Sequence, residues 1–279
     1  MPNFYMAFPG GKRKALTLSY DDGVEQDIRL MKIMDQHGLK GTFNISSGAY
    51  GPEGKKLEKG KFHRRLSYNE ATQVYTNCGH EVAIHALEHT DLSALPPSPA
   101  VWEVMKDKEN LENQFGKIIR GMAYPFGSVN DELAQTLRGA GIAYARTTVS
   151  TCKFTIPTDW LKMPATCHHK NPELMNLAKK FIEETPHWVP WLFYLWGHSY
   201  EFDQQDNWHV IEEFAEYMGN RDDIWYATNI EIYDYVQAWR GMHCSADGKR
   251  IFNPSWQPMW IVRNGEILCV NSGEEIILP

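Results

Sequence analysis

Residues 16–23 read Leu-Thr-Leu-Ser-Tyr-Asp-Asp-Gly, an apolar run that ends in two adjacent carboxylates and a glycine. A strand alternates its side chains between two faces, so Asp21 and Asp22 inside a buried strand would force at least one charge into packed surface. At the carboxyl end of a strand, both carboxylates can face a cleft instead. The stretch therefore predicts a buried strand over residues 14–20 with a functional end at Asp21 and Asp22.

Strand and helix patterns alternate along most of the chain on either side of this stretch. Strands are expected at residues 14–20, 40–45, 81–85, 121–124, 143–148, 159–163, 191–196 and 224–227. Helices are expected at residues 24–37, 68–77, 102–115, 131–139, 172–184, 209–218 and 230–239. Such alternation predicts a parallel sheet with helices outside, and the number of units favours a barrel over an open sheet. We expect an α/β fold, a distorted β/α barrel of about seven parallel strands.

The pattern breaks after residue 241. Asn264-Gly265 separates two short apolar runs, 259–262 and 266–270, which is the pattern of a β-hairpin. We expect the barrel to occupy residues 1–241 and a small β extension, packed on the barrel, to occupy residues 242–279. Residues 46–61 are rich in glycine and lysine and predict a long exposed loop.

Bulk composition limits the partners and the location. The net charge is −7 and no lysine or arginine stripe stands out, so nucleic acid and an anionic membrane are not expected partners. No apolar run approaches the roughly 18 residues of a membrane span. Five cysteines without metal-site spacing favour a reducing compartment. Residues 1–4 show no start of a signal peptide, so we expect a cytoplasmic protein, with an extracellular one as the alternative if the chain is a processed form. The sequence does not set the oligomeric state.

Residues with catalytic capacity recur at the expected carboxyl ends of strands. Asp21 and Asp22 end the first strand, His85 ends the third with His89 four residues later, and His198 follows the strand at 191–196. A parallel barrel brings these ends together, and this face carries the active site in such barrels. One helical turn would place both rings of the His85–His89 pair on one face. Two imidazoles and one carboxylate can hold zinc or another divalent transition metal.

Four segments resemble the motifs of the polysaccharide deacetylases, the family with a NodB homology domain (carbohydrate esterase family 4). Residues 18–23 are similar to the family's Thr-Phe-Asp-Asp-Gly, and residues 85–89 (His-Ala-Leu-Glu-His) to its His-Ser/Thr-x-x-His. Residues 124–127 (Tyr-Pro-Phe-Gly) are similar to Arg-Pro-Pro-Tyr-Gly, and residues 195–198 (Leu-Trp-Gly-His) to Leu-x-x-His. The resemblance extends over roughly residues 14–239.

The resemblance implies a NodB-type barrel and a role for each matching residue. It implies that the catalytic residues are Asp21 as the general base and His198 as the general acid, that the metal ligands are Asp22, His85 and His89, and that the substrate-binding residues are Tyr124, Pro125, Phe126 and Trp196. It also implies that the segment around Phe126 lends a backbone N–H to the oxyanion. The implied cofactor is Zn²⁺, with Co²⁺ or Ni²⁺ as alternatives, and the implied partner is an acetylated carbohydrate.

The sequence departs from the family at the arginine that pairs with the catalytic base, because Ala123 stands there. Arg120 and Arg146 are the candidates to reach in from elsewhere. Asp159-Trp160 matches the remaining motif only loosely. Several other polar residues are expected on solvated loops: His168, His169, Glu201, Asp203 and Asp206.

These features together predict a metal-dependent hydrolase that removes an acetyl group from an N- or O-acetylated carbohydrate. One alternative is hydrolysis of another non-peptide C–N bond, in a cyclic imide or a ureide. The second alternative is a catalytically silent carbohydrate-binding protein on the same scaffold, against which the intact set of acidic residues and histidines argues.

Overall fold

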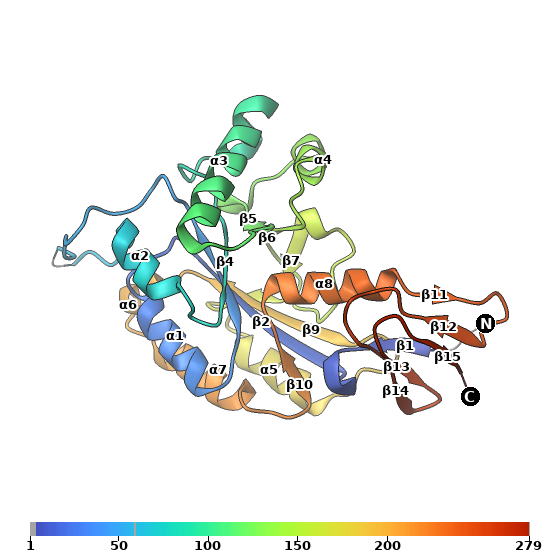
Figure 1. Cartoon of the computed structure of the whole chain (residues 1–279). Helices are drawn as coiled ribbons and strands as arrows, with labels where there is room; N and C mark the ends of the chain where they lie inside the picture. Colours follow the sequence, from blue (N-terminus) through green and yellow to red (C-terminus); the bar gives the residue numbers. More distant parts are fainter. Residues whose placement is uncertain (1–3, 59, 279) are drawn as a thin grey trace.

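The structure is a computed structural model that describes residues 4–58 and 60–278. Residues 1–3, which belong to the segment expected to lack a signal peptide, residue 59 of the expected loop, and residue 279 lie outside the described residues. A parallel sheet runs through the middle of the molecule with helices packed around it, and a group of short antiparallel strands lies at one end (Figure 1).

The central sheet has nine strands in the order β7-β6-β5-β4-β3-β2-β9-β8, with β10 also paired to β2. All its pairings are parallel. The strands are β2 (Lys14–Asp21), β3 (Gly41–Ile45), β4 (Glu81–Ile84), β5 (Gly121–Ala123), β6 (Tyr144–Ser150), β7 (Met163–Ala165), β8 (Cys167–His168), β9 (Trp191–Gly197) and β10 (Ile224–Tyr226).

The segment 163–168 closes the sheet into a barrel. Its first half, β7, pairs with β6, and its second half, β8, pairs with β9. Thr166 between them donates its backbone N–H to the Tyr194 carbonyl (2.8 Å) and accepts at its own carbonyl from the N–H of Cys152 (2.8 Å). Because β7 and β8 are consecutive parts of one segment, the ring contains seven strands, with β10 beside it. The expected barrel of about seven parallel strands is confirmed.

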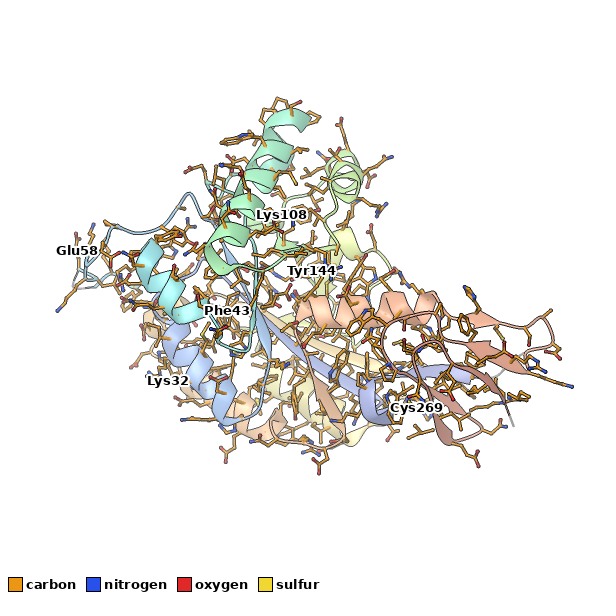
Figure 2. The ribbon with its side chains drawn as sticks, in the orientation of Figure 1. Lys32, Phe43, Glu58, Lys108, Tyr144 and Cys269 are labelled. Atoms are coloured by element: carbon orange, nitrogen blue, oxygen red, sulfur yellow. The ribbon has the colours of Figure 1, made fainter. Side chains whose placement is uncertain are left out.

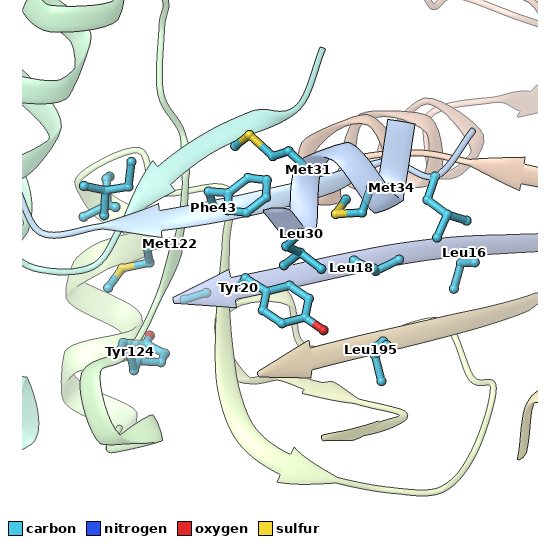
Figure 3. Packing of buried hydrophobic residues seen from close by; sticks show 14 of the residues in the cluster. Leu16, Leu18, Tyr20, Leu30, Met31, Met34, Phe43, Met122, Tyr124 and Leu195 are labelled. Atoms are coloured by element: carbon cyan, nitrogen blue, oxygen red, sulfur yellow. The ribbon is translucent and has the colours of Figure 1, made fainter. Parts of the chain in front are cut away.

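All eight residues of strand β2 are buried, because the strand lies inside the sheet between β3 and β9. Leu16, Leu18 and Tyr20 belong to the hydrophobic core that α1 also enters through Leu30 and Met34 (Figure 3). The alternate positions carry polar side chains, as the period of two along a strand requires. Thr17, for example, donates to the buried Asn229 side chain (2.9 Å). Asp21 shares this polar face, which turns its carboxylate into the barrel mouth.

The helices are α1 (Asp27–Gln36), α2 (Tyr68–Tyr75), α3 (Pro97–Phe115), α4 (Asp131–Gly139), α5 (Leu174–Glu183), α6 (Tyr200–Gln204), α7 (His209–Met218) and α8 (Asn229–Arg240). Ser67 and Glu70 form a capping box at α2. Phe43 of β3 lies between the sheet and the helices, with its ring 5.5 Å from that of Tyr75 (Figure 2). No helix in the described part of the chain is long and apolar enough to cross a membrane.

Two helix and strand predictions need correction. Helix α3 begins at Pro97, five residues before the expected start, because a proline fits the first turn, where its missing N–H has no partner in any case. Residues 159–162 are not part of a strand. Asp159 accepts a hydrogen bond from the backbone N–H of Leu161 and caps the 3-10 helix η4 (Trp160–Lys162), after which β7 begins at Met163.

The antiparallel strands at the end of the molecule form two small sheets, in the orders β1-β13-β14 and β11-β12-β15. Their bounds are β1 (Phe4–Ala7), β11 (His243–Cys244), β12 (Arg250–Phe252), β13 (Met259–Arg263), β14 (Glu266–Val270) and β15 (Glu275–Ile277). The expected hairpin around Asn264-Gly265 is confirmed, and both turn residues have positive φ. Strand β1 near the N-terminus pairs with β13 and so joins the two ends of the chain. The domain boundary at residue 241 stays a prediction.

Candidate active site

The two adjacent carboxylates at the end of β2 have separate partners. Asp21 is buried, accepts a hydrogen bond from the Asn44 side chain (2.8 Å) and forms an ion pair with Arg146. Asp22 follows the strand with φ at 81°, a conformation that non-glycine residues rarely adopt. Its carboxylate contacts Arg65 (2.8 Å) instead. The backbone turn at Asp22 therefore gives two neighbouring carboxylates two different environments.

Asp22, His85 and His89 bring together a set of groups that could hold a metal ion. One ligand atom from each lies within 4.8 Å of the others. His85 comes directly after β4, and its Nδ1 lies 2.9 Å from the Ala123 carbonyl oxygen. Since a carbonyl can only accept, Nδ1 carries the proton and Nε2 is left with the lone pair that a metal needs. This donor set fits a divalent transition metal.

Burial keeps both imidazoles in the neutral form that ligates metals. Desolvation lowers the pKa of His85 below its ordinary value, although Asp21 and Asp22 act in the opposite direction. Desolvation, together with the neighbouring His85, lowers the pKa of His89 to about 4. Neither ring has to lose a proton near neutral pH before it can bind a cation.

The turn that carries the two histidines is not helical, which corrects the expected helical turn. Ala86 and His89 both have positive φ, 59° and 55°. The ring centroids of His85 and His89 nevertheless lie 4.8 Å apart. Buried Asp107 of α3 holds the start of the turn by accepting the backbone N–H groups of His85 (3.0 Å) and Ser47 (2.7 Å). Strained backbone of this kind clusters at functional sites.

Arg146 supplies the guanidinium that the sequence motif lacks. Ala123 and Arg146 are register partners on β5 and β6, so the arginine stands one strand away from its position in the motif. The other candidate, Arg120, pairs with Asp234 of α8 (2.5 Å). Burial by itself would raise the pKa of Asp21, but the contact with Arg146, together with the nearby His85 and His198, outweighs burial and holds that pKa below its usual range.

His198 faces Asp21 from the end of β9. Its Nε2 lies 3.9 Å from Asp21 Oδ2, and its Nδ1 lies 3.6 Å from Glu201 Oε1. Burial acts against the charged imidazolium, but the contacts with Glu201 and Asp21 raise the pKa of His198 above its ordinary value. The proton on this imidazole is therefore held more firmly than on a free histidine.

Glu201 is not on a solvated loop, contrary to expectation, and His169 is not exposed. Glu201 is 8% exposed, and its carboxylate lies 2.6 Å from Lys170 Nζ, 3.1 Å from His169 Nε2 and 3.3 Å from His168 Nε2. Burial acts against ionisation, but these donors hold the pKa of Glu201 well below its usual range. The three-residue spacing from His198 was the only sequence signal for this contact.

His168, His198 and Glu201 also bring three possible ligand atoms within 4.8 Å of one another. The backbone N–H of Lys170 donates to His168 Nδ1 (3.1 Å), so the proton of the neutral ring sits on Nε2, which faces Glu201. A protonated ring nitrogen has no lone pair with which to ligate a cation. This second cluster does not fit a cation.

The predicted substrate-binding residues divide into exposed and buried ones. Phe126 is 65% exposed, has φ at 60°, and its ring lies 4.9 Å from that of His89. Trp196 is buried and lies under the Arg146 guanidinium at 4.4 Å. Pro125 is buried. The structure corrects the prediction that Tyr124 binds substrate. Its ring lies in the core (Figure 3), and its hydroxyl donates to the Leu161 carbonyl (2.9 Å). The side chain therefore cannot contact substrate.

A cluster of this composition at the carboxyl ends of parallel barrel strands is typical of metal-dependent hydrolases. Comparison with known protein families indicates which class of hydrolase the chain resembles. Residues 9–145, just under half of the chain, match the sequence model of the polysaccharide deacetylases, and this match supports a carbohydrate-deacetylating hydrolase. The matched segment contains Asp21, Asp22, His85 and His89 but ends before His198.

A solved structure supports the fold. The crystal structure of a presumed polysaccharide deacetylase from Mycobacterium smegmatis has a TM-score of 0.61 at 16% identity, over 86% of this chain and 96% of that one. A carbohydrate esterase family 4 pseudoenzyme from Bacillus anthracis has a TM-score of 0.48 at 18% identity, over 82% and 68%. The Streptococcus pyogenes deacetylase PplD in complex with acetate has a TM-score of 0.44 at 20% identity, over 52% and 61%. No curated protein matches the chain.

Proposed function

We propose that this protein is a metal-dependent hydrolase that removes an acetyl group from an N- or O-acetylated carbohydrate. The observation that carries the proposal is that the two neighbouring carboxylates at the end of β2 have different partners. Asp22 converges with two neutral histidines, whereas Asp21, the next residue, is paired with Arg146 and faces His198. A merely structural acidic pair would not need two such different sets of partners.

Asp22, His85 and His89 would hold the metal, for which Zn²⁺ suits the mixture of nitrogen and oxygen ligands. When bound, the ion lowers the pKa of water towards about 7 and polarises the acyl carbonyl. His85 is oriented for this role by the Ala123 carbonyl, which keeps its proton on Nδ1.

Asp21 would act as the general base. Arg146 holds its pKa low, so the carboxylate is ionised near neutral pH and ready to accept the proton of the attacking water. The buried ion pair also keeps the carboxylate from turning away, because Asn44 and Arg146 each hold one of its two oxygens. The backbone N–H of Phe126 is our candidate donor to the oxyanion that then develops.

His198 would protonate the leaving amine or alcohol. An amine leaves poorly as an anion, so its departure needs a proton donor within reach. Glu201 lies on the Nδ1 side of the ring, so Nε2 is the nitrogen that points to Asp21 and the reacting atoms. The raised pKa of His198 keeps that proton available near neutral pH.

The decisive experiment measures acetate release from chitooligosaccharides by the zinc-loaded protein, beside ring opening of small cyclic imides and ureides. Acetate release that depends on Asp21 supports the proposal. Ring opening without acetate release would favour the alternative C–N hydrolase. A zinc-loaded protein that binds the sugar but turns over none of these compounds would be the silent carbohydrate-binding protein.

A further inference from the structure

Three carboxylates stand around the proposed reacting atoms, and each already has a cation of its own. The pairs are Asp21 with Arg146, Asp22 with Arg65, and Glu201 with Lys170. These charges cancel pair by pair. A divalent cation on Asp22 would add two positive charges that the three paired carboxylates do not neutralise, so the loaded site attracts an anion.

Arg65 is placed beside Asp22 by backbone pairing with the chain that leaves β2. Arg65 and Val24 form an antiparallel bridge. The N–H of Leu66 donates to the Gly23 carbonyl (2.9 Å), which fixes the register next to Asp22. Side chains alternate along such an extended segment, so neighbouring residues point to opposite sides.

The two adjacent arginines of this segment use their donors differently. Arg64 has its Nε 2.5 Å from Glu25 and its Nη1 2.8 Å from Glu70, so its fork is occupied by carboxylates. Arg65 donates from Nη2 to Asp22 Oδ1 (2.8 Å), and its Nε is buried without a hydrogen-bond partner among the described residues. A guanidinium carries five N–H donors in a planar fork that matches a carboxylate or a phosphate.

We propose that Arg65 recognises an anionic group, a carboxylate or a phosphate, on the substrate close to the acyl group that is removed. The inference rests on the proposed function and names its substrate class as an acidic acetylated carbohydrate. A metal ion held by Asp22, His85 and His89 would compete with Arg65 for the Asp22 carboxylate, and the guanidinium donors that Asp22 does not occupy would then be available to an anionic group of the substrate.

The surroundings of Arg65 suit such a substrate. His63 lies beside it over Asp22, with Nε2 3.2 Å from the carboxylate and a side chain that is 43% exposed. The ring of Tyr200 packs edge-on against His63 at 4.8 Å. Exposed Phe126, next to His89, offers an apolar face for a sugar ring.

The test measures binding to the zinc-loaded protein by calorimetry, independently of turnover. The probes are a neutral chitooligosaccharide and an oligosaccharide of equal length in which N-acetylglucosamine alternates with a uronic acid. A phosphorylated N-acetyl sugar, compared with its neutral parent, decides whether carboxylate or phosphate is preferred. The variants are Arg65→Gln, Arg65→Lys and, as the matched control, Arg64→Gln, and the zinc content of each is measured.

We expect the wild type to prefer the acidic ligand, and Arg65→Gln to weaken its binding about tenfold or more, as loss of a charge-assisted pair does. Binding of the neutral ligand should change less than about twofold, Arg65→Lys should keep part of the preference, and Arg64→Gln should change neither. Equal affinity of the wild type for both ligands overturns the inference, as does equal weakening of both in Arg65→Gln. Charge preference without any acetate release would uphold Arg65 and reject the proposed function.

Discussion

The buried ion pair between Arg146 and Asp21 offers the sharpest test of the site. The side chains of Arg146 and Asp21 are 0% and 4% exposed, so solvent screens their interaction very little. Removing one partner of a buried pair generally costs about 3–5 kcal/mol, because the other charge stays buried and uncompensated. Asn44 would still donate to Asp21, so we expect Arg146→Met to lower the free energy of unfolding by about 3 kcal/mol near neutral pH.

The pH dependence of this loss has a defined sign. In the wild type the pKa of Asp21 is held below its ordinary value, so its stabilising contribution is present above the ordinary pKa and is lost as the pH falls. In Arg146→Met burial is opposed only by the Asn44 hydrogen bond and the nearby His85 and His198, so that pKa rises and the carboxylate becomes less stabilising as the pH rises. The difference between the two proteins should therefore grow with pH, by about 1.4 kcal/mol for each unit by which the pKa moves.

Urea denaturation of the metal-free proteins between about pH 3 and about pH 8 measures both effects, because this range crosses the ordinary aspartate pKa of about 3.9. Adding Asp21→Asn to Arg146→Met removes the stranded charge and should restore about 2 kcal/mol near neutral pH, which a double-mutant cycle will show. A loss that is equal at both ends of the pH range, or no recovery in the double variant, would refute the reasoning.

Four further predictions follow from the site and the core. Asp22→Ala should abolish stoichiometric zinc binding, measured by emission spectrometry, and full zinc content in this variant would contradict the ligand set. Asp21→Asn should keep zinc and lose about 10²–10⁴-fold in turnover, the usual range for a general base, and a near wild-type rate would require another base. Burial raises the pKa of Glu81 to about 7, so its stabilising effect is present below its ordinary pKa and is lost as the pH rises through about 7. Glu81→Gln should therefore flatten the fall in melting temperature between pH 5 and pH 8, a span of about the size of this shift, and an unchanged slope would contradict the assignment. Tyr124→Phe should lower the free energy of unfolding by about 1–3 kcal/mol with KM unchanged, since the buried Leu161 carbonyl loses its hydrogen-bond donor. A raised KM would instead indicate that the Tyr124 side chain contacts substrate.

Sequence patterns predicted the elements whose structure depends on interactions between residues close together in the chain. The alternation in β2, the capping box of Ser67 and Glu70, and the Asn264-Gly265 turn all depend on residues close together in the chain. The barrel was predictable for a related reason, since alternating strands and helices leave few arrangements for a parallel sheet.

Predictions failed where the neighbours come from distant segments. Tyr124 is close to the site in sequence, but its side chain enters the core, where the Leu161 carbonyl accepts its hydroxyl. Glu201 was expected in solvent, but the turn after β9 brings it against His168 and His169, which come from the neighbouring strand segment. Burial of a polar side chain depends on what packs over it, and composition alone does not show that.

By itself, the sequence determined that Asp21 and Asp22 end a central strand, and that His85, His89 and His198 end others. Only the tertiary structure decided which cations these carboxylates meet. Arg146 reaches Asp21 because β5 and β6 pair in a register that sets it beside Ala123, and Arg65 reaches Asp22 through a bridge to Val24. Strand register and loop pairing depend on contacts between segments far apart in the chain, so the charges that surround the site are a property of the folded barrel.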